Sequence, residues 1–154
     1  MSQSDIFNAL THHHDIQRKL CQELQSAITQ KDRLKAQSAF TCLKNELEAH
    51  AAAEERHLYV PVMAFDDGLE LSRHAIAEHH EMDEMMAVLS DGRTGDERFF
   101  ETARALIDET LHHLKEEENE FFKEAKKLLD KPTQERLGKL YQAEHQAFED
   151  KHGE

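Results

Sequence analysis

The residues of this chain best suited to chemistry are two copies of the pattern His-x-x-x-Glu, at positions 50–54 and 113–117. Each copy is preceded at a similar distance by a single histidine, His13 and His79 respectively. A histidine and a glutamate four residues apart lie on the same face of a helix. Four helices carrying these groups would surround one point with four imidazoles and two carboxylates, a ligand set for a pair of transition-metal ions. The predicted metal ligands are His13, His50, Glu54, His79, His113 and Glu117.

These six residues occupy positions at which the apolar stripe of a helix would otherwise continue. One His–Glu pair on an acidic helix is most simply a surface ion pair. Two pairs on core stripes, with apolar neighbours such as Leu47, Leu58 and Leu106, are different. Burying a carboxylate costs several kcal/mol unless another charge compensates it. Metal ions supply that compensation, so the pattern predicts a metal site.

The ligand types narrow the choice of metal. Structural zinc sites are closed and often use thiolates, and neither Cys21 nor Cys42 lies at ligand spacing. Calcium and magnesium prefer oxygen ligands throughout. Mixed imidazole and carboxylate favours iron, with manganese or zinc as substitutes. Six protein ligands cannot saturate two iron ions, so bridging groups from outside the protein and at least one open position are expected.

Long helices should carry these residues, because the chain has only 5 Gly and 2 Pro. Apolar residues at helical spacing predict helices at about 5–29, 32–60, 69–89, 96–129 and 132–150. Pro61 should stop or kink the second helix close to Val60. Short connections between long helices predict an all-α fold, an up-and-down antiparallel four-helix bundle with a short C-terminal fifth helix. We expect a single domain over residues 1–154, with the bundle at about 5–129.

The formal charge of −13 argues against nucleic acid and anionic membranes as partners, because phosphate groups demand Lys and Arg. The charge is compatible with attracting cations, although a solvated acidic helix surface is the simpler explanation of it. The N-terminal residues lack a basic segment followed by an apolar one, so no secretory signal is expected. No apolar run approaches the roughly 20 residues of a membrane span, and the two cysteines form no disulfide framework. We expect a cytoplasmic protein.

These motifs resemble the hemerythrin family, specifically the bacterial HHE cation-binding branch with the pattern H…HxxxE…H…HxxxE. The resemblance covers about residues 6–129 and includes HAAAEERHLYVP from residue 50 and HLKEEENEFF from residue 113. Glu78 and His79, followed by Met82, are similar to the third-helix motif of that family. The resemblance implies a cofactor of two iron ions with an oxo or hydroxo bridge. It also implies that the four histidines are terminal ligands and that Glu54 and Glu117 bridge the irons.

The third helix departs from the oxygen-carrying hemerythrins. Those proteins have a further histidine four residues from its partner, whereas this chain has Ala75 and Asp83 at the two positions with that spacing around His79. One iron ion is therefore short of a histidine. Asp83, a tyrosine such as Tyr59, or water would take that place, which weakens the expectation of reversible oxygen carriage.

The first helix is ambiguous because residues 12–14 are all histidines. His13 is preferred, since apolar residues follow it at positions 16 and 20 much as methionines follow His79. His14 together with His80 is the alternative register. The remaining histidines are expected at the surface or flanking the site; they include His57, His74, His112 and His145.

The leading functional hypothesis is a non-haem di-iron protein that binds or reacts with oxygen, nitric oxide or hydrogen peroxide, or that handles iron. Whether it is an enzyme or a binding and sensing protein is left open, as is a homodimer. The alternative is a ferritin-like di-iron oxidase or iron-storage bundle, which would use Glu-x-x-His at 54–57 and 109–112. A metal-free interaction bundle is disfavoured by the buried carboxylates.

Overall fold

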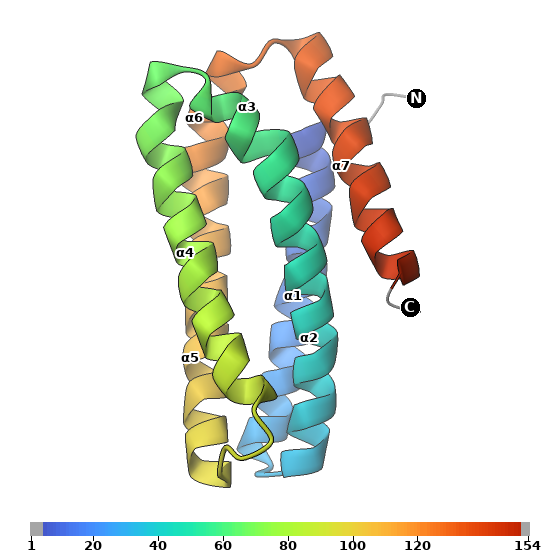
Figure 1. Ribbon diagram of the computed structural model, residues 1–154, viewed down its shortest axis with the longest axis vertical. Helices are drawn as coiled ribbons and strands as arrows, with labels where there is room; N and C mark the ends of the chain where they lie inside the picture. The colour runs from blue at the N-terminus through green and yellow to red at the C-terminus, as the bar shows by residue number, and fades with distance from the viewer. Residues whose placement is uncertain (1–4, 152–154) are drawn as a thin grey trace.

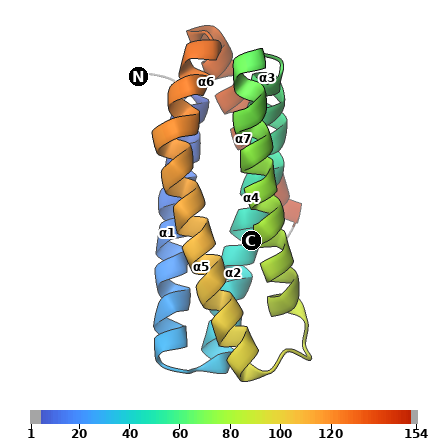
Figure 2. The ribbon, with the colours of Figure 1, turned by 90° about the vertical axis from the view of Figure 1, so that its left-hand side faces the viewer.

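The computed structural model describes residues 5–151, and its helices run up and down one long axis (Figures 1 and 2). The four long bundle helices are α1 (Ile6–Thr29), α2 (Arg33–Glu54), α4 (Asp66–Ser90) and α5 (Asp96–Glu116). Over the described residues the chain contains helices and no strand. The predicted all-α antiparallel bundle is confirmed.

Two of the bundle helices continue through widened, π-helical turns. The continuations are η1 (Glu55–Tyr59) and α3 (Val60–Met63) after α2, and η2 (Glu117–Phe121) and α6 (Phe122–Leu128) after α5. Each π segment begins at or directly after the glutamate of a His-x-x-x-Glu motif. Single π turns inside α-helices occur frequently at functional sites. Because both π turns lie at or directly after a motif glutamate, Glu54 and Glu117 are candidates for functional residues.

The second helix, which the sequence predicted to stop or kink close to Val60, is interrupted just before that residue by η1 but does not stop there. It remains helical to Met63, and Pro61 lies in the first turn of α3. A proline is tolerated in a first turn, because the amide hydrogen that it lacks has no helical partner there. The π turn of η1 precedes it and interrupts the regular hydrogen-bond pattern that a proline would otherwise break.

Aspartate side chains fix where the first two helices begin. Asp5 accepts a hydrogen bond from the Asn8 amide at 2.8 Å, and Asp32 accepts one from the Lys35 amide at 3.1 Å. Between α1 and α2, Lys31 adopts a left-handed conformation with φ of 57°. Capping of this kind contributes about 1 kcal/mol per helix. These boundaries set the phase with which α1 and α2 face each other.

The C-terminal helix α7 (Lys131–Lys151) packs along the outside of α1 and α2 (Figure 1). It begins beside Asp130, whose carboxylate accepts a hydrogen bond from the Thr133 amide at 2.9 Å. Its buried side chains include Tyr141 and His145, whereas Leu140 is 44% exposed. The predicted fifth helix is confirmed.

Two apolar clusters fill the interior of the bundle. One contains Phe7, Tyr59, Phe121 and Tyr141, and the other contains Leu24, Phe40, Leu43, Met82, Phe99 and Leu106. A band of buried polar side chains belongs to neither cluster. In the described part of the chain, no helix combines the length and the apolar character needed to cross a membrane.

Candidate metal centre

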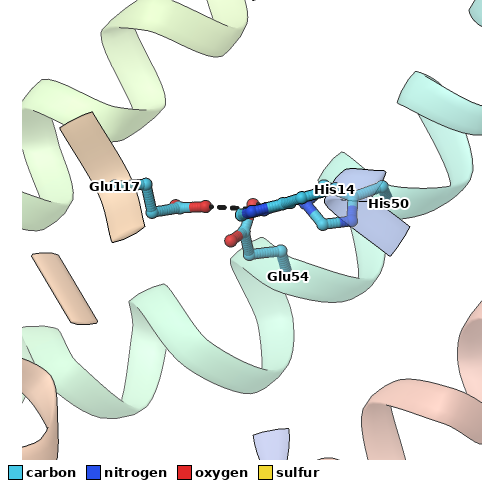
Figure 3. Close-up of side chains that lie close together, drawn as sticks. All are labelled: His14, His50, Glu54 and Glu117. Carbon is cyan, nitrogen blue, oxygen red and sulfur yellow. Dashed lines mark ion pairs between the residues drawn. The ribbon is translucent and has the colours of Figure 1, made fainter. Parts of the chain in front are cut away.

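Six buried side chains from four directions make up the polar band inside the bundle. They are His14, His50, Glu54, His79, His113 and Glu117, each no more than 4% exposed. Figure 3 shows four of them converging, with His14 from α1, His50 and Glu54 from α2, and Glu117 from η2. His79 comes from α4 and His113 from α5. Every bundle helix therefore contributes at least one group.

The potential ligand atoms fall into two groups that share Glu54. Those of His14, His50, Glu54 and Glu117 all lie within 4.8 Å of one another, and so do those of Glu54, His79 and His113. In the first group, His14 Nε2 lies 3.1 Å from Glu117 Oε1, and His50 Nε2 lies 3.1 Å from Glu54 Oε1. In the second, His79 Nε2 lies 3.1 Å from His113 Nε2.

Both glutamates lie between the two groups. Glu54 Oε1, which faces His50, is also 3.5 Å from His79 Nε2. Glu117 directs Oε1 towards His14, while its Oε2 lies 3.8 Å from His113 Nε2 and accepts a hydrogen bond from the Tyr59 hydroxyl. The two carboxylates can therefore bridge two cations, one in each group.

All four imidazoles direct Nε2 inwards and use Nδ1 for an outer hydrogen bond. The Nδ1 partners of His14, His50, His79 and His113 are, in that order, Glu118, Tyr141, Glu55 and Glu78, at 2.7, 2.7, 2.9 and 2.7 Å. Metal-binding histidines are commonly held in this way, because an outer partner fixes both the ring orientation and the tautomer. The arrangement leaves Nε2 of each ring available to a metal.

The centre is short of hydrogen-bond partners. Among the described residues, the buried side-chain atoms without one include His14 Nε2, His50 Nε2, both oxygens of Glu54, and Glu117 Oε1. The 3.1 Å contacts between these nitrogens and oxygens are at ion-pair distance but lack hydrogen-bond geometry. A buried polar atom left unpaired costs about 1–3 kcal/mol. Metal cations would satisfy all five atoms, so the residues present fit a metal pair.

Protons partly balance the two carboxylates without a metal. Burial lowers the pKa of His14, but its close contacts with the carboxylates of Glu117 and Glu118 outweigh burial and raise the pKa to about 9. For His113, the charge of Glu117 and the hydrogen bond to Glu78 likewise overcome burial and raise the pKa to about 9. Burial and the nearby His14 keep the pKa of His50 well below its ordinary value. Metal binding would displace the protons of the first two rings.

Comparison with known families gives one result: the profile described as the Hemerythrin HHE cation binding domain matches residues 5–125. The chain belongs to this family. The comparisons with curated proteins and with solved structures gave no match. The matched region contains all six side chains of the polar band, so the description of the family as cation-binding agrees with the cluster in the bundle. The whole of α7 lies outside the match.

Within this hemerythrin domain, His13 lies beside the centre and not in it. Its Nδ1 is 2.7 Å from the Tyr141 hydroxyl, and its ring stacks on that of His145 with 3.9 Å between centroids. His14 occupies the place that the sequence assigned to His13. The other five predicted ligands are brought together, and His79 occupies the α4 position while His80 is exposed. The observed set thus combines His14 from the alternative register with His79 from the preferred one.

A different apolar stripe on α1 explains the placement of His14. Positions 7, 10, 14, 17, 21, 24 and 28 alternate steps of three and four, and all are buried. This is the seven-residue repeat of bundle seams. The predicted stripe instead ran through Ile16, which is 38% exposed. Reading the repeat from Phe7 would have selected His14, so the signal was present in the sequence.

Of the two side chains considered for the missing third-helix histidine, only Tyr59 reaches the interior. Its side chain is fully buried, with its hydroxyl 3.4 Å from His79 Nε2 and bonded to Glu117. Burial and the charges of Glu117 and Glu54 raise the pKa of the Tyr59 phenol well above its ordinary value. Asp83 is exposed on α4. Tyr59 therefore places an oxygen donor, in addition to the carboxylates of the centre, beside Nε2 of His79 in the second group.

The C-terminal helix adds a functional residue that the sequence reasoning missed. The Tyr141 hydroxyl lies 2.7 Å from Nδ1 of both His13 and His50, yet it carries a single proton. If His50 uses Nε2 for a metal, its Nδ1–H donates to Tyr141, and Tyr141 donates to His13. Burial and the neighbouring His145 lower the pKa of His13 to about 4, so that ring is neutral and can accept. Leu137, Tyr141 and His145, spaced by four, are the pattern that could have revealed this face.

The ferritin-like ligand set does not assemble. His57 Nε2 lies 2.8 Å from Glu144 on α7, facing away from the centre, and the His112 side chain is 62% exposed. Glu109 is only half-buried. Of the Glu-x-x-His residues, only Glu54 belongs to the buried group.

Proposed function

We propose that the chain holds two iron ions with an oxo or hydroxo bridge, and that the pair binds or reacts with a small ligand such as oxygen, nitric oxide or hydrogen peroxide. The proposed ligands are His14, His50, Glu54, His79, His113 and Glu117, with Glu54 and Glu117 shared between the ions. The observation that carries the proposal is the set of inward Nε2 atoms around two carboxylates that lack hydrogen-bond partners. Mixed nitrogen and oxygen donors in this number suit iron.

The two halves of the centre are unequal, which favours reaction at one of them. The first group contains two histidines and both carboxylates, whereas the second consists of His79, His113 and the carboxylate of Glu54. Tyr59 is the additional oxygen donor on that side. If bound iron displaced the proton of this phenol, the resulting phenolate would stabilise ferric over ferrous iron, because it is a harder and more anionic donor than an imidazole. We therefore expect oxygen to oxidise the reduced centre promptly and not to be carried reversibly.

Space for a ligand lies on the same side. A small cavity of about 10 Å³ is bordered by His50, His79, His113 and Thr110. That volume is close to what a single water molecule needs. A bound water or hydroxide there would be exchanged for a ligand of two or three atoms only if Met82 or a neighbouring side chain moved slightly. This cavity accordingly favours very small ligands.

The optical spectrum of the iron-loaded protein tests this function. Azide or nitric oxide should shift the charge-transfer bands of the oxidised or reduced centre, and reduction followed by oxygen should restore the oxidised spectrum promptly. Glu54→Gln should abolish these bands, while the matched change Glu48→Gln on the same helix should leave them. Bands insensitive to every small ligand, or a form that releases oxygen under vacuum, would contradict the proposal.

A further inference from the structure

A second pair of His-x-x-x-Glu motifs lies on the outside of the bundle. His74 and Glu78 are four residues apart on α4, and His112 and Glu116 are four apart on α5. Each pair occupies one face of its helix. Because α4 and α5 pack against each other along their length, the two pairs meet at the helix interface. The buried centre uses none of these four side chains as a ligand.

Ligand atoms of His74, Glu78 and Glu116 all lie within 4.8 Å of one another, and His112 adjoins this group through the two carboxylates. His74 Nε2 lies 2.8 Å from Glu116 Oε1 and 3.2 Å from Glu78 Oε2. His112 Nε2 lies 3.6 Å from Glu116 Oε2 and 3.8 Å from Glu78 Oε2. Each imidazole therefore faces both carboxylates, and each carboxylate faces both imidazoles.

These separations match a metal coordination shell. Four ligand atoms arranged tetrahedrally at bond lengths of roughly 2.0–2.1 Å stand about 3.3 Å apart. The observed nitrogen–oxygen distances, from 2.8 to 3.8 Å, bracket that value. Two imidazoles and two carboxylates suit zinc and other divalent ions of the first transition series. An ion held by His74, Glu78 and Glu116 would gain His112 as its fourth ligand only after that exposed side chain rotated towards it.

The position of the cluster distinguishes it from an ordinary surface ion-pair network. His74, Glu78 and Glu116 border a cavity of about 150 Å³ whose inner wall includes His113 and Glu117 of the buried centre. The His74 and His112 side chains are 59% and 62% exposed, so an ion could reach them from solvent. The cluster thus stands at the outer end of a cavity that reaches the centre.

Glu78 connects the two places directly. Its side chain is only 8% exposed, and its Oε1 accepts a hydrogen bond from Nδ1 of His113 at 2.7 Å, while Oε2 faces His74 and His112. Although burial opposes ionisation, the bond to His113 holds the pKa of Glu78 below its ordinary value. One carboxylate therefore offers an oxygen to the cluster while orienting a proposed iron ligand.

We propose that His74, Glu78, His112 and Glu116 bind one divalent transition-metal ion at the entrance of the cavity leading to the buried centre. This site is separate from the proposed iron pair and would be the first protein ligand set met by an ion entering there. Occupation of the site would be sensed at the centre through Glu78 and His113.

Zinc binding to the iron-loaded, oxidised protein tests the proposal. Equilibrium dialysis against zinc, followed by elemental analysis, should show one zinc ion per chain above the bound iron, with the absorption of the iron centre retained. The double change His74→Ala/His112→Ala should weaken zinc binding by at least about tenfold, since even groups that only orient a metal ligand are worth about 10–100-fold. The matched control His12→Ala/His80→Ala removes two exposed histidines elsewhere and should bind zinc like the unaltered chain.

Glu116→Gln provides a second variant that retains the shape of the side chain and leaves Glu78 and His113 in place. It should also weaken zinc binding, even if the histidine double variant folds poorly. Equal zinc affinity in all variants, or no zinc bound by the unaltered chain, would overturn the proposal and identify the cluster as ion pairs alone. Because zinc is measured directly, the outcome does not depend on the identity of the ligand at the iron pair.

Discussion

Replacing His14 by alanine should remove most of the iron affinity of the centre, whereas replacing His13 should preserve it. The two residues are neighbours, but His14 is fully buried with Nε2 directed at Glu117, while His13 faces Tyr141 and His145. Even outer groups that orient metal ligands contribute about 10–100-fold to affinity. Loss of the His14 imidazole itself should therefore weaken iron binding by about 100-fold or more.

This loss can be expressed as a change in melting temperature. With free iron well above both dissociation constants, a 100-fold weaker Kd lowers the free energy of unfolding by about 2.7 kcal/mol. For a domain of this size, 1 kcal/mol corresponds to about 2–4 °C in Tm. The iron-dependent rise in Tm should thus be about 5–10 °C smaller for His14→Ala than for the unaltered protein.

Thermal unfolding with and without iron measures this difference for each variant separately. Subtracting the metal-free Tm removes the packing loss that any truncation of the buried His14 ring causes. His13→Ala should keep an iron-dependent rise close to that of the unaltered chain. If His13→Ala lost the iron effect and His14→Ala retained it, the first-helix ligand would be His13 and the placement argued above would be refuted.

Three further changes test the surroundings of the centre. Tyr141→Phe should leave Nδ1–H of His50 buried and unpaired. The metal-free protein should lose about 1–3 kcal/mol of stability, and iron should bind about 10–100-fold more weakly. Unchanged denaturant midpoints and iron titrations would contradict this. Raising the pH from about 6.5 to about 9 should destabilise the metal-free protein. The raised pKa values of His14 and His113 stabilise the folded state fully at pH values below the pKa of histidine in the unfolded chain, and this stability is lost as the two rings lose their protons. The denaturant midpoint of the iron-loaded form, whose rings are already deprotonated, should not fall in parallel. Tyr59→Phe should alter the charge-transfer absorption of the iron-loaded protein, and an identical spectrum would exclude the phenol oxygen as a donor.

The bundle and most of its polar band could be predicted because they depend on local spacing. His50 with Glu54, and His113 with Glu117, interrupt apolar stripes at positions that must face the interior of an amphipathic helix. Neither an apolar neighbour nor water can compensate two buried carboxylates there. The chemistry of the site thus followed from residue type and helical period alone.

The phase of α1 was harder to predict, because three consecutive histidines cover more than half a helical turn. Two of these histidines are shielded from solvent, His13 partly by α7 and His14 fully by the bundle. A histidine of α1 can be buried for two reasons, because it faces the candidate metal centre or because α7 covers it. The second reason applies to His13, which is shielded by α7 but does not belong to the central group.

The outer partners of the ligands could not be predicted, because they join positions far apart in the chain. Tyr141 reaches His50 across 91 residues, and Glu118 reaches His14 across 104. Such contacts depend on how α7 and η2 dock, which the periodicity of each separate helix does not determine. Glu118 and Glu55, which directly follow Glu117 and Glu54 in the chain, contact Nδ1 of His14 and His79.

A crystal structure of the iron-loaded protein, with anomalous scattering recorded at the iron absorption edge, tests the central claim most directly. Two iron peaks should appear in the anomalous map inside the bundle, about 3.5–4 Å apart as in other two-metal sites. Glu54 and Glu117 should lie between the peaks, with His14 and His50 at one ion and His79 and His113 at the other. A single iron peak, or a peak bound by His13 in place of His14, would contradict it.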